Sequence, residues 1–459
     1  MVVLEASCSC PVGWSLHLLH VGSEMWRTPG AVVARGFLNY GSGRLCPDLA
    51  SVLSVLRANP SKEVQSNRLS TIRIAIIMSC AHGLNDAYAS FVPPLLPRIM
   101  DDLGLSIAMA ATLAVSFSIA SALPQPLFGY LADRKGRRIL AVAGPLITGV
   151  FVASIGFAGS FWVLVLLLTL GGLGCAAFHP PGASYAVRIL EGKGGGARYS
   201  IFSFGGSVGF AVGPLAAVGL VQWRGMEGLW LAMLPVVILM PIFFFGLPSG
   251  RAEVAQNSAP PSLRMVLKHL AGPLGLIFGI SATMAFVQRA FLTMEPIIVA
   301  HSGGSETLGA VALSVYLGAQ AFGTVAGGLL SDRVNRASLL VHLCLWALPA
   351  HLLAIWLGPQ TGLGLAATGV AGFLAMATLP PIVVMAQEMI PGAAAVSSGI
   401  VMGLAWAMGS IGVLGTGVLA DSIGPQLATL VSMPVIVIAI LLSLHPALRQ
   451  GRVDSAAEI

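Results

Sequence analysis

Charged side chains are scarce in this sequence. Asp, Glu, Lys and Arg make up only 9% of its 459 residues, 56% are hydrophobic, and the mean hydropathy is +0.87. Soluble domains typically carry about 25% charged residues, so this balance excludes a soluble enzyme. Apolar stretches of about 20 residues, enough to cross a bilayer of roughly 30 Å, recur from Ile72 to Leu444. Because these runs are long and continuous, they predict an all-α polytopic membrane protein rather than a β-barrel.

Patterns that carry enzyme or metal chemistry are also missing. The six cysteines show no paired metal-ligand spacing, since Cys8 and Cys10 form a lone C-x-C. No nucleophile–base pair, P-loop or metal cluster is evident, so we expect no enzyme, no catalytic residue, no metal and no cofactor. The net charge of +6 does not indicate a nucleic-acid site, because the positions of the basic residues are explained by the orientation of the chain in the membrane. The N-terminal region has no hydrophobic segment followed by a cleavage site and therefore no recognisable signal peptide.

Twelve candidate spans lie between charged or Gly/Pro-rich segments. They divide the chain into an N-terminal six-helix bundle (71–246) and a C-terminal six-helix bundle (271–446), joined by a cytoplasmic linker (247–270) and followed by a cytoplasmic tail (447–459). Residues 1–70 differ in composition and predict a disordered extension or a wrongly assigned translational start. The spans are expected to begin near Ile72, Ala108, Ile139, Phe161, Tyr199, Leu229, Pro273, Leu308, Ser338, Leu363, Ala394 and Leu427.

Lys and Arg predict the orientation of these spans. With a cytoplasmic N-terminus, the inner loops after residue 130 hold most of the basic residues, whereas the outer loops hold only Arg98 and Arg224. We therefore expect a multi-pass protein of the cell (inner) membrane with both termini in the cytoplasm.

The two halves repeat each other. GYLADRKGRR (129–138) ends the second span and GLLSDRVNR (328–336) ends the eighth, while double prolines recur in spans four and ten. Duplicated halves that enclose a site near the bilayer midplane are typical of secondary transporters. A third copy, GVLADSIG (417–424), ends a span on the opposite side of the membrane and is interpreted only as a helix terminus.

The loop at 129–138 resembles the conserved cytoplasmic loop of the major facilitator superfamily, and 328–336 resembles a weaker copy of it. Gly209, Gly213 and Pro214 resemble part of that superfamily's antiporter helix-packing motif. The resemblance covers roughly residues 72–445 and implies a fold of twelve transmembrane helices in two six-helix bundles.

Three further stretches are similar to the fosmidomycin resistance branch of this superfamily. They are His82-x-x-Asn85-Asp86, Phe178-His179-Pro180, and the run from Ser200 to Pro214. This resemblance implies proton-driven export of small drugs. Members often carry an acid directly after the His-Pro pair, and because Pro181 stands there, the role of that acid is not carried over.

Asp86 lies about 14 residues into its span, or roughly 21 Å along a helix, near the bilayer centre. A lipid-facing carboxylate there costs at least about 2.5 kcal/mol, so Asp86 must face a cavity or a partner, or be protonated. His82 is one turn earlier on the same face. We predict that Asp86, His82 and His179 couple transport to protons. The alternative is that they serve only as hydrogen-bonded structural residues.

Pro93 and Pro94 are expected to bend the first span and free backbone carbonyls one turn earlier. Arg289 and Gln288 form a strongly polar pair inside a span of the second half, and an arginine suits a carboxylate or phosphonate. The predicted substrate-binding residues are Arg289, Gln288, Asn85, Gln125, Tyr316 and Gln320. Packing or pairing with a buried acid remains open for each of them.

The resemblance also implies a conformational latch, meaning a contact that stabilises one transport state. A carboxylate at Asp133 can stabilise the N-terminal dipole of a facing helix. The predicted latch residues are Gly129, Asp133, Arg134, Gly136, Arg137, Arg138, Asp332 and Arg333; the alternative is that the basic ones only set topology.

These patterns favour a secondary active transporter, a proton-coupled antiporter that exports small drugs or organic anions. The alternatives are a proton symporter that imports an organic acid and, more remotely, a membrane sensor that transports nothing. The predicted partners are a small-molecule substrate, protons and the lipid bilayer. We expect no nucleic-acid partner and a monomeric protein.

Overall fold

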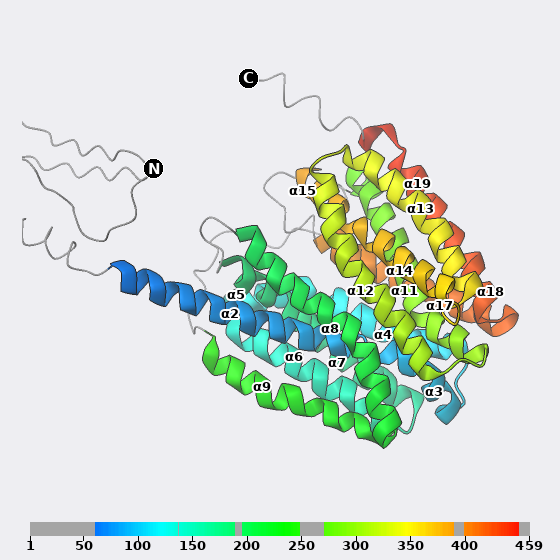
Figure 1. The fold of residues 1–459 in the computed structure, drawn as a ribbon, viewed down its shortest axis with the longest axis horizontal. Coiled ribbons are helices and arrows are strands. Elements are labelled where there is room, and N and C mark those ends of the chain that lie inside the picture. The colour runs from blue at the N-terminus through cyan, green and yellow to red at the C-terminus, as the bar shows by residue number, and fades with distance from the viewer. Residues whose placement is uncertain (1–59, 136, 189–194, 248–269, 390–398, 449–459) are drawn as a thin grey trace, which may run out of the picture. The chain divides into compact units, whose positions relative to one another are not determined.

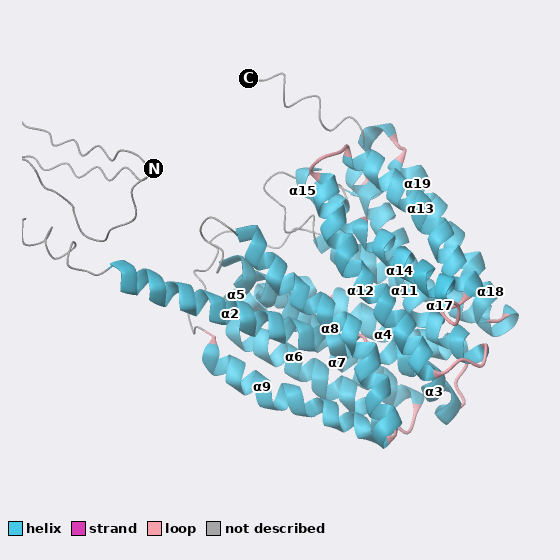
Figure 2. Ribbon diagram, viewed as in Figure 1, coloured by secondary structure: helices cyan, strands magenta, loops and turns pink. Residues whose placement is uncertain are grey.

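The computed structural model describes residues 60–135, 137–188, 195–247, 270–389 and 399–448. Every regular element among these residues is a helix (Figure 2). Eleven segments of the described chain are long and apolar enough to cross a membrane. The predicted class, an all-α polytopic membrane protein, is confirmed.

The first half contains α2 (Pro60–Ala89), α3 (Val92–Leu103), α4 (Ile107–Ala122), α5 (Gln125–Lys135), α6 (Arg137–Ala153), η1 (Ser154–Phe157), α7 (Phe161–Arg188), α8 (Gly195–Arg224), η2 (Met226–Ala232) and α9 (Met233–Gly246). The second half contains α11 (Pro273–His301), α12 (Glu306–Ser331), α13 (Arg336–Leu357), α14 (Gly362–Ala377), α15 (Leu379–Met389), the π-helix η3 (Gly399–Leu404), α17 (Ala405–Ile423), α18 (Pro425–Ser432), η4 (Met433–Val435), α19 (Ile436–Ser443) and η5 (Pro446–Leu448).

The span expected from Ile72 is not among the eleven, although α2 and α3 form it. Its polar residues His82, Asn85 and Asp86 account for its lower hydropathy, and the helix already begins at Pro60. The start expected near Ala394 falls outside the described residues. Most of the extension at 1–70 and of the linker at 247–270 also lies outside them, and the chain divides into the units Met1–Glu63 and Val64–Ile459.

Within Val64–Ile459, the turn between the first two spans of each half has the same construction. Gly104 has a φ of 62° and Gly303 a φ of 77°, in the left-handed region that favours glycine. Two residues later Ser106 and Ser305 cap α4 and α12 by accepting a backbone hydrogen bond. This shared turn supports the duplication inferred from the loop sequences.

The two halves join through matching helix pairs, with α4 packed on α17 and α8 on α12. The halves converge near α3, α4, α17 and α18, and their helices diverge toward the ends of α5 and α15 (Figure 1). We call the converging end the α3/α18 end. The basic-residue pattern predicts that it is the outer end.

Polar contacts bridge the halves at the α3/α18 end. Arg98 of α3 forms a bidentate ion pair with Glu306 of α12, with N···O distances of 2.7 and 3.1 Å. The Asp421 carboxylate of α17 accepts hydrogen bonds from the backbone N–H groups of Ile107 (2.7 Å) and Ala108 (3.1 Å) at the start of α4. These contacts hold the halves together at this end.

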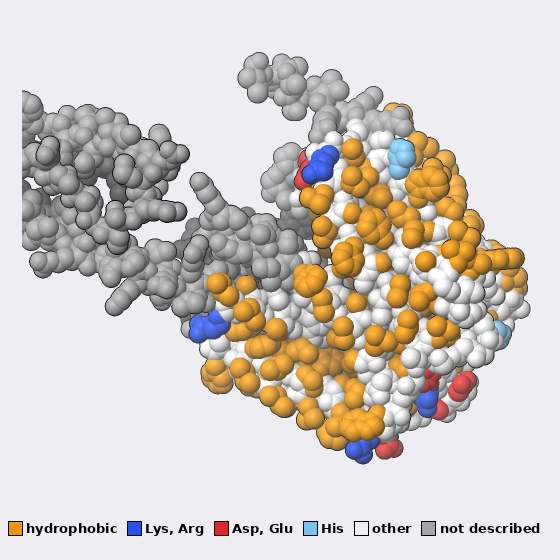
Figure 3. All heavy atoms as spheres, viewed as in Figure 1, with side chains coloured by type: hydrophobic (Ala, Val, Ile, Leu, Met, Phe, Trp, Pro, Cys, Tyr) orange, Lys and Arg blue, Asp and Glu red, His pale blue; other side chains and the backbone are white. Residues whose placement is uncertain are grey.

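The surface fits a bilayer. On the face shown in Figure 3, hydrophobic side chains cover the middle of the helices, and charged side chains gather near the helix ends. Large apolar residues such as Trp162, Phe245 and Phe322 are more than two-thirds exposed. In a membrane, lipid chains rather than water would cover these side chains.

Candidate functional site

The first span breaks just after the polar residues that the sequence singles out. Helix α2 ends at Ala89 and α3 begins at Val92, with Pro93 and Pro94 in the first turn of α3. Because proline has no backbone N–H, a helix cannot continue through it with all its hydrogen bonds. The break places Ser90 and Pro93 beside a cavity between the halves.

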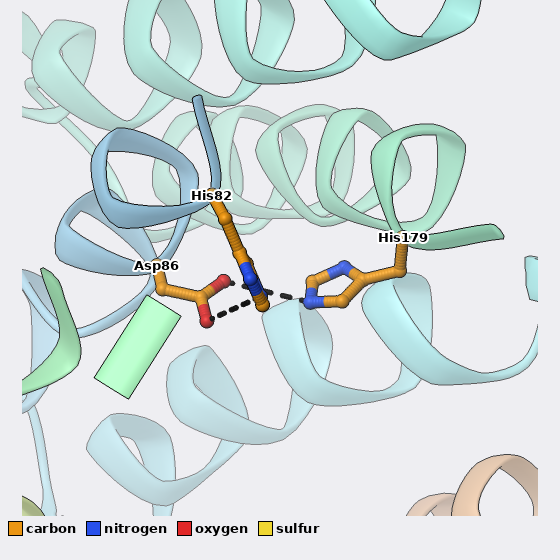
Figure 4. A group of neighbouring side chains, drawn as sticks. All are labelled: His82, Asp86 and His179. Atoms are coloured by element: carbon orange, nitrogen blue, oxygen red, sulfur yellow. Dashed lines mark ion pairs between the residues drawn. The ribbon is translucent and has the colours of Figure 1, made fainter. Parts of the chain in front are cut away.

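His82, Asp86 and His179 form a cluster within the first half (Figure 4). His82 Nε2 lies 3.1 Å from Asp86 Oδ2, and His179 Nε2 lies 3.5 Å from Asp86 Oδ1. Asp86 is only 4% exposed. The one-turn spacing of His82 and Asp86 was visible in the sequence, and the fold adds His179 from α7. We call these three residues the triad.

The second nitrogen of each imidazole ring defines its protonation pattern. His82 Nδ1 lies 2.9 Å from the Phe202 carbonyl oxygen, and His179 Nδ1 lies 2.9 Å from the Cys175 carbonyl oxygen. A carbonyl oxygen can only accept, so both Nδ1 atoms donate their hydrogens. Each Nε2 therefore faces a carboxylate oxygen and donates a hydrogen bond to it only when the ring carries an additional proton. If the carboxyl group is protonated instead, its O–H donates to an Nε2.

Asn85 fixes the position of the carboxylate. Its amide donates to Asp86 Oδ1 at 3.1 Å and to Cys175 Sγ at 3.4 Å. Its carbonyl oxygen accepts a hydrogen bond from Thr148 of α6 at 3.1 Å. Asn85 was predicted to bind substrate, but it is fully buried in this network, which connects the triad to α6 and α7.

Helix α8 closes over the triad through its glycines. A Cβ atom at Gly206 would lie 2.5 Å from the His82 ring and 2.8 Å from Asp86 Oδ2, and one at Gly209 or Gly213 would overlap the backbone of α2. Phe202 stacks on the His82 ring with centroids 4.2 Å apart. The sequence indicated Gly209, Gly213 and Pro214 as a packing motif, but it did not reveal Gly206 and Phe202 as neighbours of the triad.

Arg289 of α11 lies in the second half and faces the first. Its guanidinium carbon is 5.5 Å from the centre of the Trp406 ring, and its charge is close enough to Asp86 for the two to interact. Among the described residues, no hydrogen bond or ion pair to this half-buried guanidinium is found. It is the charged member of the cavity lining, which comprises Ala89, Ser90, Val92, Pro93, Ala114, Phe117, Ser118, Phe210, Arg289, Leu292, Thr293, Leu313 and Leu317.

The other predicted substrate residues lie outside this lining. Gln288 and Gln320 interact with each other, with Nε2 of Gln320 3.4 Å from Oε1 of Gln288. Tyr316 is fully buried, lies 3.1 Å from His351 Nε2 and stacks on Phe291. Gln125 donates to the carbonyl oxygen of Ser121, one turn earlier.

The residues predicted to form a latch lie at the end opposite α3 and α18. The side chains of Asp133 and Arg134, and all of Gly136, are outside the described residues. Arg138 stacks on Phe244, 3.8 Å from the ring centre. Asp332 and Arg333 are exposed, and neighbouring Arg336 pairs with Glu388 of α15 at 2.7 Å. Gly129 lies near Pro180 of α7, and Arg137 begins α6.

A second carboxylate that bridges the two halves, besides Glu306, belongs to the third copy of the loop sequence. Asp421 caps the start of α4 at the α3/α18 end, a role that the sequence interpretation missed. The available signal was the repeated Asp in GVLADSIG. An acid beside a helix N-terminus is stabilised by the free N–H groups there.

The sequence predicted neither metal nor cofactor. Among the described residues, the triad is nevertheless a group that could hold a metal ion. The nitrogen and oxygen atoms that could act as ligands lie within 4.8 Å of one another. Protons satisfy the same contacts without a metal.

Two helical halves that enclose a buried polar site define a secondary-transporter architecture. The family model described as Major Facilitator Superfamily matches residues 78–395. The chain belongs to this superfamily and is a multi-pass membrane transporter of small molecules.

Two bacterial relatives match over most of the chain. The uncharacterized MFS-type transporter YfnC of Bacillus subtilis (strain 168) is 27% identical over 86% of this chain and 98% of its own length. The fosmidomycin resistance protein of Escherichia coli (strain K12) is 28% identical over 75% of this chain and 85% of its own length. The predicted likeness to that branch is confirmed.

Solved structures share the fold at low sequence identity. A bacterial homologue of the human lysosomal transporter Spinster, in an inward-facing and unoccupied conformation, aligns with a TM-score of 0.70 and 18% identity over 83% of this chain and 97% of its own. The inward-open xylose transporter XylE of E. coli aligns with a TM-score of 0.63 and 15% identity over 82% of this chain and 95% of its own.

Proposed function

We propose that the protein is a proton-coupled antiporter that exports small drugs or organic anions. The observation that carries this proposal is the triad, in which two imidazole Nε2 atoms face the two oxygens of one buried carboxylate. Both Nδ1 hydrogens already bond to backbone carbonyls, so one added proton is needed for each Nε2···O contact to become a hydrogen bond. The triad can therefore hold two protons.

Losing these protons changes the charge of the site. With both rings protonated and Asp86 ionised, the triad has a net charge of +1, and without the two protons it has a net charge of −1. An ionised carboxylate surrounded by protein must be paired or hydrogen-bonded; Asn85 still donates to Oδ1 of the bare carboxylate, but Oδ2, which faced His82, then needs a new donor. We propose that the cargo supplies it.

Arg289 supplies the other part of the proposed cargo site. Its guanidinium has no hydrogen-bond or ion-pair partner among the described residues and lines the cavity between the halves. A cargo with an anionic group for Arg289 and an N–H or O–H donor for Asp86 would compete with protons for the carboxylate. This competition produces antiport, because release of one allows the other to bind.

A symporter is the second candidate because Arg289 and Asp86 are close enough for their charges to interact. An anion without a donor group gains nothing from a bare carboxylate and binds better when the triad is protonated. Such a cargo and its protons would move together.

Transport in proteoliposomes separates these candidates. Fosmidomycin, the compound in the name of one relative, is supplied outside vesicles that contain a pH-sensitive dye, with the membrane potential clamped. Antiport makes the lumen alkaline as the drug enters, whereas symport makes it acidic. Asp86→Asn should abolish proton movement while drug exchange persists, and Glu227→Gln, an exposed acid, should behave as the parent. Uphill, proton-driven transport at full rate by Asp86→Asn would sink the proposal.

A further inference from the structure

Glu295 of α11 is a buried acid that the triad does not use. Its side chain is 1% exposed, and both carboxyl oxygens are buried without a hydrogen-bond partner among the described residues. Asp86, by comparison, has two imidazole rings and an asparagine amide around it. Glu295 therefore lacks the partners that allow a buried carboxylate to stay ionised.

The charged groups on neighbouring elements pair elsewhere. Helix α11 packs against α3, α12, α15, α17, α18 and α19, and also against α14, η3 and η4, which contain no titratable side chain. Arg98 of α3 pairs with Glu306 of α12, Asp421 of α17 caps α4, and Glu388 of α15 pairs with Arg336. Asp101 and Asp102 of α3 are exposed, and α18 and α19 contain no titratable side chain.

The remaining titratable groups near α11 do not pair with Glu295 either. Tyr316 and His351 bond to each other, and the second His351 nitrogen faces the Ala347 carbonyl oxygen. On α11 itself, Arg289 lies beside the Trp406 ring, and His301 is exposed at the end of the helix. An unpaired carboxylate in such surroundings is strongly disfavoured, and it becomes tolerable when it takes up a proton.

The position of Glu295 along α11 suggests from which side that proton comes. Glu295 lies six residues beyond Arg289, about 9 Å along the helix, toward the α3/α18 end. Helices α3 and α12, which α11 contacts there, carry the Arg98–Glu306 pair. Separation of the halves at this end would bring water to Glu295, and their closure would exclude it.

We propose that Glu295 is a second proton-binding site, loaded from the α3/α18 end and occluded in its neutral form when the halves meet there. The carboxylate takes a proton from water when that end is open and returns it to water when the end opens again. This inference rests on the proposed transport cycle for its role, but proton binding at Glu295 can be tested without a substrate.

The first measurement is infrared spectroscopy of the purified full-length protein in lipid nanodiscs at neutral pH. In an Asp86→Asn background, a carbonyl stretching band from a protonated, water-excluded carboxyl group is expected. The band should be lost when Glu295→Gln is added, and it should persist with the control Glu227→Gln. Glutamine matches the neutral side chain in shape, so the variant should keep the parent's unfolding temperature. A band that is absent from the background, or that survives Glu295→Gln, overturns the proposal.

The second measurement counts exchangeable protons. Unbuffered Asp86→Asn protein is moved from mildly acidic to alkaline pH, and the protons released per molecule are measured. Adding Glu295→Gln should remove one of them. An equal count shows that Glu295 does not exchange its proton and overturns the proposal. Because both measurements use the Asp86→Asn background and no cargo, they can fail while the antiport proposal holds, and the reverse is also possible.

Discussion

At the scale of the residue, the site depends on which side chains have protein partners and which do not. Asp86 is surrounded by His82, His179 and Asn85, whereas the guanidinium of Arg289 has only the Trp406 ring near it among the described residues. A buried polar group without a partner in the protein is available to a ligand. Arg289 is therefore the residue whose replacement should affect the cargo most directly.

Arg289→Lys keeps the charge of the side chain but removes the planar fork that can bind two oxygens at once. We expect anion affinity to fall about tenfold, or ~1.4 kcal/mol, with proton binding by the triad unchanged. The measurement is the dissociation constant of fosmidomycin for purified protein. Arg224→Lys, at an exposed arginine that also stacks on a tryptophan, is the matched control. Equal affinities for the Arg289→Lys variant and the parent would argue against the anion site.

The sequence predicted part of this site because some of its residues are close together in the sequence. His82 and Asp86 are one turn apart, so helical geometry alone puts them on one face. His179 came from the resemblance, and only packing of α7 against the rest of the half brings it to Asp86. A single apolar sequence does not fix the rotation of a helix about its axis, so it could not show that Asn85 and Tyr316 both face the interior of a bundle. Their assignment to the substrate stays a prediction.

At the scale of the element, α8 contacts α2 closely enough to cover the triad. Gly206 leaves room for the His82 ring, which Phe202 holds by stacking and by accepting its Nδ1 hydrogen. A methyl group at position 206 would displace either that ring or the helix. The glycine-rich face of α8 therefore determines the geometry of the triad.

Gly206→Ala should lower the unfolding free energy by about 1–3 kcal/mol and disrupt proton coupling, because the added carbon would lie 2.5 Å from the His82 ring. Gly219→Ala on the same helix meets nothing within 4 Å and should stabilise the protein by up to about 1 kcal/mol through helix propensity. Thermal unfolding together with dye-monitored proton flux measures both effects. Similar behaviour of the two variants would contradict close packing of α8 on His82.

Most element boundaries followed from the sequence because helix ends carry local signals. Expected starts near Ala108, Leu308 and Leu363 lie within two residues of the observed helices, where Ser106, Ser305 and Thr361 act as N-caps. The start expected near Ile72 differs more, since α2 already begins at Pro60. Hydropathy detects the membrane-crossing part of a helix but not a polar extension of it.

At the scale of the whole molecule, the Arg98–Glu306 ion pair and the hydrogen bonds that Asp421 accepts at the start of α4 join the halves at the α3/α18 end, and the cavity lies between the halves. The sequence could not reveal these pairs because their members are about 200 or more residues apart. Separation of the halves at this end, which alternating access requires, breaks both contacts. Their strength therefore influences the population of the two transport states.

The Arg98–Glu306 pair can be used to test how these contacts affect the population of the two transport states, and exchanging its two residues provides the control. Arg98→Glu should favour the state open at the α3/α18 end, and the swapped pair Arg98→Glu/Glu306→Arg should restore the parent's balance. The side chains are 38% and 20% exposed, so solvent screening limits the shift to about twofold to fivefold. The readout is the rate at which an impermeant maleimide, added outside intact cells, labels Ser118→Cys in a background without native cysteines. A swapped pair that labels as fast as Arg98→Glu would exclude a specific role for this contact.

The triad is held by α2, α7 and α8, all from the first half, whereas the free guanidinium is on α11 in the second. In the proposed antiport, the proton-binding triad would therefore lie in the first half and the anion-binding guanidinium in the second, while the cavity takes residues from both halves. Under the proposed function, variation among the second-half residues of the cavity could alter which cargo binds without rebuilding the triad. The range of cargo could in this way change through substitutions confined to residues 271–446.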